Sequence, residues 1–186
     1  MKNKNIDTAV ILAAGKGERI SNIGKFVAKP LIKIFDVSLI ERSIRNLINN
    51  LNIKKIYIIT GFNHKEINNH LVKLKNKFSI NIDVVFAKDW EKGNGASFLA
   101  ILDKISNQQF YLLKADHLFN DEFYKTILKY KINNKSYLII SRTLSSLNNF
   151  NDATKVNVVN DKINDIGKSI KDSNGLDTGF FILNSD

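Results

Sequence analysis

The 186-residue sequence contains no cysteine, one proline and one tryptophan. The lack of cysteine excludes a disulfide scaffold, a thiol nucleophile and a cysteine-ligated zinc or iron–sulfur site. No apolar run approaches the roughly 20 residues that cross a bilayer, and residues 1–7 are mostly polar and charged, unlike a signal peptide. We therefore expect a cytoplasmic protein that does not insert into a membrane.

Negative charge is also scarce, because 18 Asp+Glu against 28 Lys+Arg give a net charge of +10. Such an excess favours an anionic partner, which would be nucleic acid, a membrane surface or a phosphorylated small molecule. The lysines are scattered and never form a run of five basic residues, so most of this charge is expected on a solvated surface. A basic RNA-binding module would also carry it, but no aromatic-rich strand motif is present, and no nucleic-acid partner is expected.

Short apolar runs rich in β-branched residues alternate with segments of helical period. The expected strands are 8–12, 55–60, 82–86, 110–114, 137–140 and 180–183, and the expected helices are 38–50, 65–78, 97–105 and 121–130. Ser38 and Glu41 are spaced as a capping box at the first helix. The alternation predicts an α/β fold with a Rossmann-like, mostly parallel sheet flanked by helices. Two short strands around Asn160-Asp161 predict a β-hairpin excursion near residues 150–168.

The first strand leads directly into a loop of small residues, Leu12-Ala-Ala-Gly-Lys-Gly-Glu-Arg19. Small residues let backbone N–H groups approach phosphate oxygens, and the Arg19 guanidinium can bind phosphate in a bidentate way. The dinucleotide fingerprint is excluded by Ile20, and the Walker loop is excluded because Phe26 follows Gly24-Lys25. A phosphate cradle and an ordinary glycine turn both remain open.

Lys29 precedes the single proline, Pro30. Proline biases the preceding residue toward extended backbone, which would hold the Lys29 ammonium in place. Together with the small-residue loop and Arg19, this lysine would supply the positive charge that a triphosphate needs.

Asp116 follows the strand expected at 110–114, and ligands bind at the carboxyl ends of parallel strands. Carboxylates combined with substrate phosphates are what Mg²⁺ prefers, although a turn or capping role is the alternative. Its neighbour His117 either orients the Asp116 carboxylate or is a plain loop residue, and the second interpretation is slightly favoured. His64 and His70 are expected at the surface. No pair of histidines has metal-ligand spacing, so zinc is not expected.

A second loop, Asp89-Trp-Glu-Lys-Gly-Asn-Gly-Ala-Ser97, leads into a helix. Its glycines allow close approach to a flat ligand such as a base, and Glu91 can accept hydrogen bonds from hydroxyl groups. A purely structural loop is an equal alternative. Trp90 is either a core anchor or a lid residue, and a place in the core is favoured. Lys155 and Asp177 add one lysine and one carboxylate late in the chain.

Leu12-Ala-Ala-Gly-x-Gly-x-Arg19 followed by Lys29-Pro-Leu31 resembles the opening signature of sugar-phosphate nucleotidyltransferases. Within that superfamily, the sequence resembles the inositol-1-phosphate cytidylyltransferases, which form the cytidylyltransferase domain of bifunctional IPC transferase and DIPP synthase. Five stretches carry this similarity: Asp89-Trp-Glu-Lys-Gly-Asn-Gly95, Ala115-Asp-His-Leu-Phe119, Asp152-Ala-Thr-Lys-Val156, Asp165-Ile-Gly-Lys168 and Asp177-Thr-Gly179. The family domain usually continues for a few dozen residues further. The resemblance therefore implies a single domain over 1–186 that lacks the family's C-terminal helices.

The resemblance also implies a role for each matching residue. Nucleotide binding would fall to Leu12, Ala13, Ala14, Gly15, Gly17, Glu91, Asn94 and Gly95. Arg19 and Lys29 would act on the triphosphate and the pyrophosphate leaving group, and Lys155 would bridge the α-phosphate and the acceptor phosphate. Asp116 and Asp177 would bind Mg²⁺, the only cofactor implied.

The implied reaction transfers CMP from CTP to inositol 1-phosphate and releases pyrophosphate. The implied partners are CTP, a phosphorylated acceptor and a neighbouring membrane-embedded synthase, and a homo-oligomer is left open. Three alternatives remain: another acceptor such as a hexose 1-phosphate or phosphocholine, a uracil or thymine base, or a noncatalytic nucleotide-binding relative.

Overall fold

The computed structural model describes residues 6–17, 28–143 and 152–186. Within them, an eight-stranded sheet has the order β5-β4-β1-β6-β10-β8-β9, and β7 also pairs with β10. Its strands are β1 (Thr8–Ala13), β4 (Lys55–Thr60), β5 (Asn81–Phe86), β6 (Gln109–Lys114), β7 (Tyr137–Ser141), β8 (Lys155–Val159), β9 (Lys162–Gly167) and β10 (Gly175–Asn184). The α-helices are α1 (Leu39–Leu51), α2 (His64–Phe78), α3 (Asn94–Leu99) and α4 (Asp121–Lys129). Short elements are the 3₁₀ turns η2 (Lys29–Leu31), η3 (Trp90–Lys92) and η4 (Leu102–Lys104), and the hairpin β2 (Lys33–Ile34) with β3 (Val37–Ser38).

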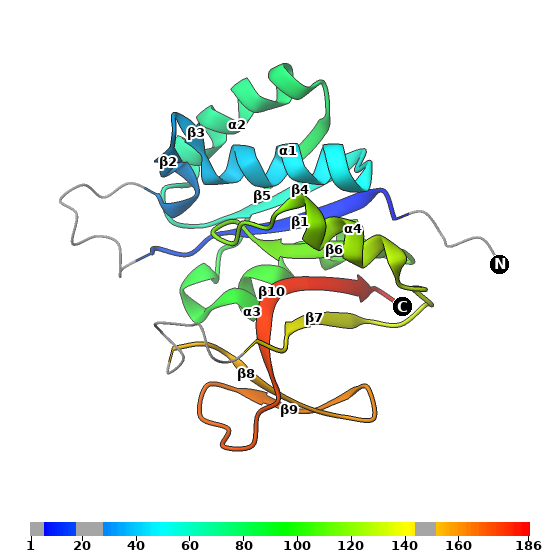
Figure 1. The fold of residues 1–186 in the computed structure, drawn as a ribbon. Coiled ribbons are helices and arrows are strands. Elements are labelled where there is room, and N and C mark those ends of the chain that lie inside the picture. Colours follow the sequence, from blue (N-terminus) through cyan, green and yellow to red (C-terminus); the bar gives the residue numbers. More distant parts are fainter. Residues whose placement is uncertain (1–5, 18–27, 144–151) are drawn as a thin grey trace.

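The parallel half of the sheet, β5-β4-β1-β6, is apolar on both faces. Along β1, Ala9 and Ile11 face one hydrophobic cluster and Val10 faces another. Helices α1, α2 and α4 cover the first face, whereas α3 and the residues after it cover the second (Figure 1). This arrangement explains why the strands appear as continuous apolar runs, and it confirms the expected fold class.

The antiparallel half is organised by β10, which pairs with β6, β7 and β8. A register shift lies between Asp177 and Phe180, and Phe180 pairs with Leu113. The β8–β9 hairpin therefore extends the main sheet through β10 and forms the far end of the molecule (Figure 1). Its turn residues Asn160 and Asp161 have φ values of 50° and 58°, as a two-residue type I′ turn requires.

Two expected backbone conformations are wrong. The helix expected at 97–105 is instead α3, which begins earlier at Asn94, followed by η4. Ile101 and Ile105 are both fully buried, and this four-residue spacing imitates a continuous helix in the sequence. Lys29 is not extended before Pro30 but starts η2, where its carbonyl accepts a hydrogen bond from Ile32 N.

The predicted capping box forms only in part. Ser38 Oγ accepts from Glu41 N at 3.2 Å, while the Glu41 carboxylate accepts from Arg45 and Lys77, each at 2.8 Å. Lys77 of α2 thus donates to the Glu41 carboxylate, which in a complete capping box would accept from the Ser38 backbone N–H. This ion pair links α1 to α2.

The expectation that His64 and His70 lie at the surface is also wrong. Both are half-buried, since His64 Nδ1 lies 2.6 Å from Thr60 Oγ1 and His70 Nε2 lies 2.8 Å from Ser38 Oγ. Burial lowers the pKa of His70, which favours its neutral form. His64 therefore connects α2 to the end of β4, and His70 connects α2 to the N-cap of α1.

Candidate active site

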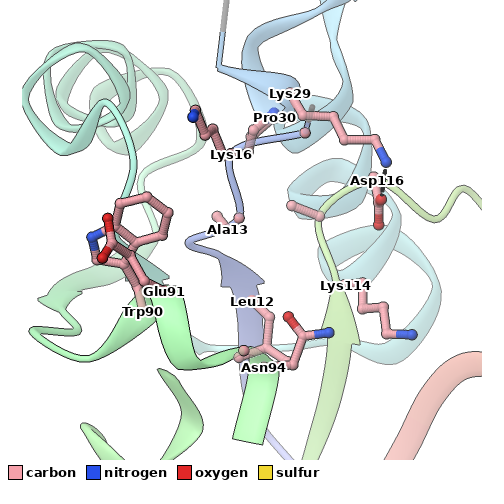
Figure 2. Close-up of a pocket in the computed structure, with 14 residues that line it drawn as sticks. Leu12, Ala13, Lys16, Lys29, Pro30, Trp90, Glu91, Asn94, Lys114 and Asp116 are labelled. Carbon is pink, nitrogen blue, oxygen red and sulfur yellow. Dashed lines mark hydrogen bonds and ion pairs between the residues drawn. The ribbon is translucent and has the colours of Figure 1, made fainter. Parts of the chain in front are cut away.

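A cavity of about 600 Å³ opens where β1 and β6 end. Because these parallel strands are in register with Leu12 opposite Lys114, the loops that follow them emerge side by side. Figure 2 shows Trp90 and Glu91 on one side of the end of β1, and Lys29, Asp116 and Lys114 on the other. The cavity is lined by Leu12, Ala13, Gly15, Lys16, Gly17, Lys29, Pro30, Trp90, Glu91, Gly93, Asn94, Lys114, Ala115 and Asp116.

We call this space the nucleotide cavity, after the ligand that the sequence leads us to expect. Two glycines allow its walls to close on the backbone. Gly17 has a φ of 67°, and a Cβ there would lie 3.1 Å from Lys29 Cβ. A Cβ on Gly61 would lie 2.3 Å from Trp90 Cγ and 2.9 Å from the Ala14 carbonyl oxygen. Glycine is therefore needed at both positions, at Gly17 for conformation and at Gly61 for space.

The Asp116 carboxylate is held between two donors. Lys29 Nζ bonds one oxygen, as Figure 2 shows, and His117 Nδ1 lies 2.7 Å from the other. Burial alone would raise the pKa of Asp116, but the hydrogen bonds from His117 and Lys29 outweigh it and hold that pKa below its usual range. Asp116 is therefore an anion at every physiological pH.

A second cavity, of about 660 Å³, adjoins the first. The two share Asn94, Lys114 and Asp116. We call this second space the acceptor cavity, after the second ligand that the sequence leads us to expect. Its remaining lining comes from His117, Ser141, Thr143, Asp152, Ala153, Thr154, Lys168, Leu176, Asp177 and Thr178. Space for two ligands thus meets at one point beyond the end of β6.

The Asp177 carboxylate enters this second cavity from β10. Its side chain is only 6% exposed, and one oxygen accepts from Gly179 N at 2.6 Å. The other oxygen lies 3.6 Å from Lys114 Nζ. Because β10 runs antiparallel to β6 with Phe180 opposite Leu113, Asp177 is carried toward the end of β6 where Asp116 lies.

Asp116 and Asp177 are the residues that the resemblance implies as ligands of Mg²⁺. In the described ranges, no three acidic or histidine side chains cluster as a complete metal site. Mg²⁺ is usually bound by one or two carboxylates together with substrate phosphates and water. Asp116 and Asp177 border the same cavity and offer hard oxygen donors, so these residues fit Mg²⁺ bound together with a nucleotide.

Most of the predicted site residues gather here. Lining the nucleotide cavity are Leu12, Ala13, Gly15, Gly17, Lys29, Glu91, Asn94 and Asp116, and Asp177 lines the acceptor cavity. Among the described residues, the cavity linings do not include Ala14, Gly95 or Lys155. The Ala14 carbonyl accepts from Phe62 N at 3.0 Å, and Lys155 pairs with Leu176 in the sheet. Arg19 lies outside the described residues.

Sequence reasoning underestimated three contributors to the site. Trp90, expected in the core, packs on the second hydrophobic cluster and also lines the nucleotide cavity. His117, interpreted as a plain loop residue, binds Asp116. Lys168 lies 2.7 Å from Asp152 at the acceptor cavity, and its only sequence signal was its place in a stretch that resembles the family.

A family model described as nucleotidyl transferase matches residues 8–149, more than half of the sequence. The chain belongs to the nucleotidyl transferase family. This membership confirms the superfamily expected from the opening signature and from Lys29-Pro-Leu31. A nucleoside triphosphate and a sugar-phosphate-type acceptor are accordingly the ligand classes of the family, and two adjoining cavities match two ligands.

Curated relatives agree with the finer resemblance. A protein from Aquifex aeolicus named "Bifunctional IPC transferase and DIPP synthase" is 30% identical over 178 residues, covering 96% of this chain and 39% of that protein. One of the same name from Thermococcus kodakarensis is 28% identical over 180 residues, covering 97% of this chain and 38% of that protein. This member of the nucleotidyl transferase family thus spans well under half the length of those relatives.

Solved structures confirm the fold. The structure of the inositol-1-phosphate CTP transferase from T. maritima matches with a TM-score of 0.85 at 24% identity, covering 98% of this chain and 72% of that chain. A UDP-glucose pyrophosphorylase complexed with UDP-glucose matches with a TM-score of 0.74 at 21% identity, covering 96% of this chain and 76% of that chain.

No helix within the described ranges combines the length and apolarity that crossing a membrane requires.

Proposed function

We propose that this chain transfers CMP from CTP to inositol 1-phosphate, giving CDP-inositol and pyrophosphate. The observation that carries the proposal is the pair of adjoining cavities that share Asn94, Lys114 and Asp116 in a nucleotidyl transferase. The choice of nucleotide and acceptor is supported by the names of the curated relatives and of the T. maritima structure.

The shape and charge of the first cavity suit a nucleoside triphosphate. Gly15 and Gly17 leave backbone exposed for phosphate oxygens, and Lys16 and Lys29 add cations at the same wall. Trp90 offers an aromatic ring on the opposite wall, where a base and ribose would lie. The acceptor would occupy the second cavity, near Lys168 and Thr178.

The reaction needs no general base, because the acceptor phosphate is already an anion at neutral pH. One of its oxygens forms a bond to the α-phosphorus of CTP, and the bond from that phosphorus to the β-phosphate bridging oxygen breaks. Pyrophosphate leaves with the electron pair. The protein's task is to align the two ligands and to offset the repulsion between two anions.

Asp116 and Asp177 would hold Mg²⁺, which when bound supplies positive charge to phosphate oxygens. Lys29, which pairs with Asp116 in the structure, can exchange this carboxylate for the triphosphate and then for the leaving pyrophosphate. Lys155 remains a predicted contributor from β8.

The experiment is pyrophosphate release over a matrix of CTP, UTP and dTTP with inositol 1-phosphate, glucose 1-phosphate and phosphocholine. We expect the highest kcat/KM for CTP with inositol 1-phosphate. Asp116→Asn should lower it by about 100-fold or more, since it removes a carboxylate proposed to hold the Mg²⁺ that offsets the phosphate charge. Asp103→Asn, an equal change at an exposed residue of η4, should leave it within about twofold, as expected for surface substitutions.

The matrix also decides between the alternatives. Turnover only with another pair reassigns the acceptor or the base. CTP binding without turnover of any pair identifies a noncatalytic relative. Full activity of Asp116→Asn would refute the proposed metal site. If CTP and inositol 1-phosphate are the preferred pair, the CDP-linked product would suit a membrane-embedded synthase that consumes it. We propose such a synthase as the partner.

A further inference from the structure

We propose that Lys114 is a catalytic residue, whose ammonium contacts the α-phosphate of the nucleotide and the acceptor phosphate at the same time. The proposal rests on the proposed function. It assigns to a residue at the end of β6 the bridging role that the family resemblance implies for Lys155.

The position of Lys114 between the two cavities is the first argument. Only Asn94, Lys114 and Asp116, among the described residues, line both of them. The transferred phosphorus must lie where the cavities join, since the nucleotide fills one and the acceptor the other. Asn94 is neutral and Asp116 is an anion, so Lys114 is the cation of this shared wall.

The direction of the side chain is the second argument. Lys114 is the last residue of β6, and its side chain is 26% exposed. Its ammonium lies 3.6 Å from Asp177, too far for a strong hydrogen bond, so its three N–H donors are not consumed there. The buried Asp177 carboxylate keeps the ammonium at the junction but leaves donors for two phosphates.

The other lysines of the site are placed differently. Lys16 and Lys29 line the nucleotide cavity only, and Lys168 lines the acceptor cavity only, where it bonds Asp152 at 2.7 Å. Lys155 lies in β8 and is absent from both linings among the described residues. Each of these lysines is therefore suited to one ligand at most, whereas Lys114 is suited to both.

The chemistry gives this position its effect. Repulsion between the two phosphate anions grows as the new P–O bond forms and falls again when pyrophosphate leaves. A cation between them therefore stabilises the transition state more than either bound ground state. Its removal should lower kcat more than it weakens CTP binding.

The experiment compares Lys114→Met and Lys114→Arg with Lys125→Met. Methionine keeps the apolar stem and removes the charge, and arginine keeps the charge. Lys125 is an exposed residue of α4, so its substitution changes net charge equally outside the site. Trp90, the only tryptophan, lines the nucleotide cavity, and its fluorescence reports CTP binding separately from turnover.

We expect Lys114→Met to lower kcat by about 100-fold while the CTP dissociation constant rises no more than about threefold. Lys114→Arg should recover at least a tenth of the lost rate, and Lys125→Met should behave as wild type. Thermal melting is measured for each variant to detect a loss of folding. Recovery of the rate by arginine shows that the loss in Lys114→Met comes from the missing charge.

Three outcomes would overturn the proposal. If wild type turns over and Lys114→Met keeps kcat within threefold, Lys114 has no catalytic role and the proposed function stands. If both Lys114 variants lose CTP binding and melt early, the residue is structural. If wild type releases no pyrophosphate with any pair, the proposed function fails and the role of Lys114 fails with it.

Discussion

A single methyl group added at Gly61 should disturb the nucleotide cavity by displacing Trp90, which lines it. Gly61 follows β4, and its backbone lies against both the Trp90 side chain and the Ala14 carbonyl. In Gly61→Ala the added Cβ would lie 2.3 Å from Trp90 Cγ. Reaching the usual carbon–carbon separation of about 3.5 Å requires a movement of about 1.2 Å from that position.

The surroundings restrict how this movement is divided. The Ala14 oxygen, 2.9 Å from the new Cβ, is fixed by the hydrogen bond from Phe62 N. Trp90 must therefore move, and it packs on a hydrophobic cluster from which it would partly withdraw. Overpacking of this kind costs about 1–3 kcal/mol. In a protein of this size that lowers Tm by roughly 2–12 °C.

The assay combines thermal unfolding with CTP titration of Trp90 fluorescence. We expect a lower Tm and roughly tenfold weaker CTP binding, equivalent to about 1.4 kcal/mol. Gly167→Ala is the matched control, since its Cβ would meet only Ile170 at an ordinary 3.6 Å. A Gly61→Ala protein with wild-type Tm and CTP affinity would refute the packing of Trp90 on this backbone.

Two further predictions concern the core. Phe180→Ala should lower the free energy of unfolding by about 3–5 kcal/mol, because this fully buried ring contacts Tyr124 and three other aromatic rings. Chemical denaturation measures this loss, and Tyr130→Ala at an exposed position is the control. Burial raises the pKa of Tyr124 to about 12. Stability should therefore be complete below about pH 10 and decline as pH rises toward 12, by roughly 2–3 kcal/mol more in wild type than in Tyr124→Phe. Equal declines in both proteins would contradict this.

The parallel half of the fold was predictable because its signal is local. Val10 and Ile11 alternate between two buried faces, so an unbroken apolar run identified β1 without knowledge of its partners. The small hairpin β2–β3 was not predictable. Its turn residues Phe35 and Asp36 have φ values of 48° and 61°, and a phenylalanine in the left-handed region contradicts the usual preference for asparagine and glycine.

The candidate site was predictable where residues follow a strand and less so where they depend on pairing. Asp116 was found because the carboxyl end of β6 is a ligand position in any parallel sheet. Asp177 has no such local signal, because it reaches the site through the antiparallel pairing of β10 with β6. For His117 the sequence left two interpretations open, contact with the adjacent Asp116 or a plain loop role. Its close packing against Gly179 comes from three-dimensional structure and has no signal in the sequence.

The charges of the site explain why the overall charge of +10 says little about the ligand. Lys29 pairs with Asp116, Lys114 lies near Asp177, and Lys168 pairs with Asp152. A polyanion that engaged these lysines alone would leave the half-buried Asp116 carboxylate and the buried Asp177 carboxylate without their partners, which is costly. A phosphate that arrives with a cation satisfies both members of a pair. These pairings therefore favour the proposed small phosphorylated ligand, bound together with Mg²⁺, over a nucleic-acid backbone.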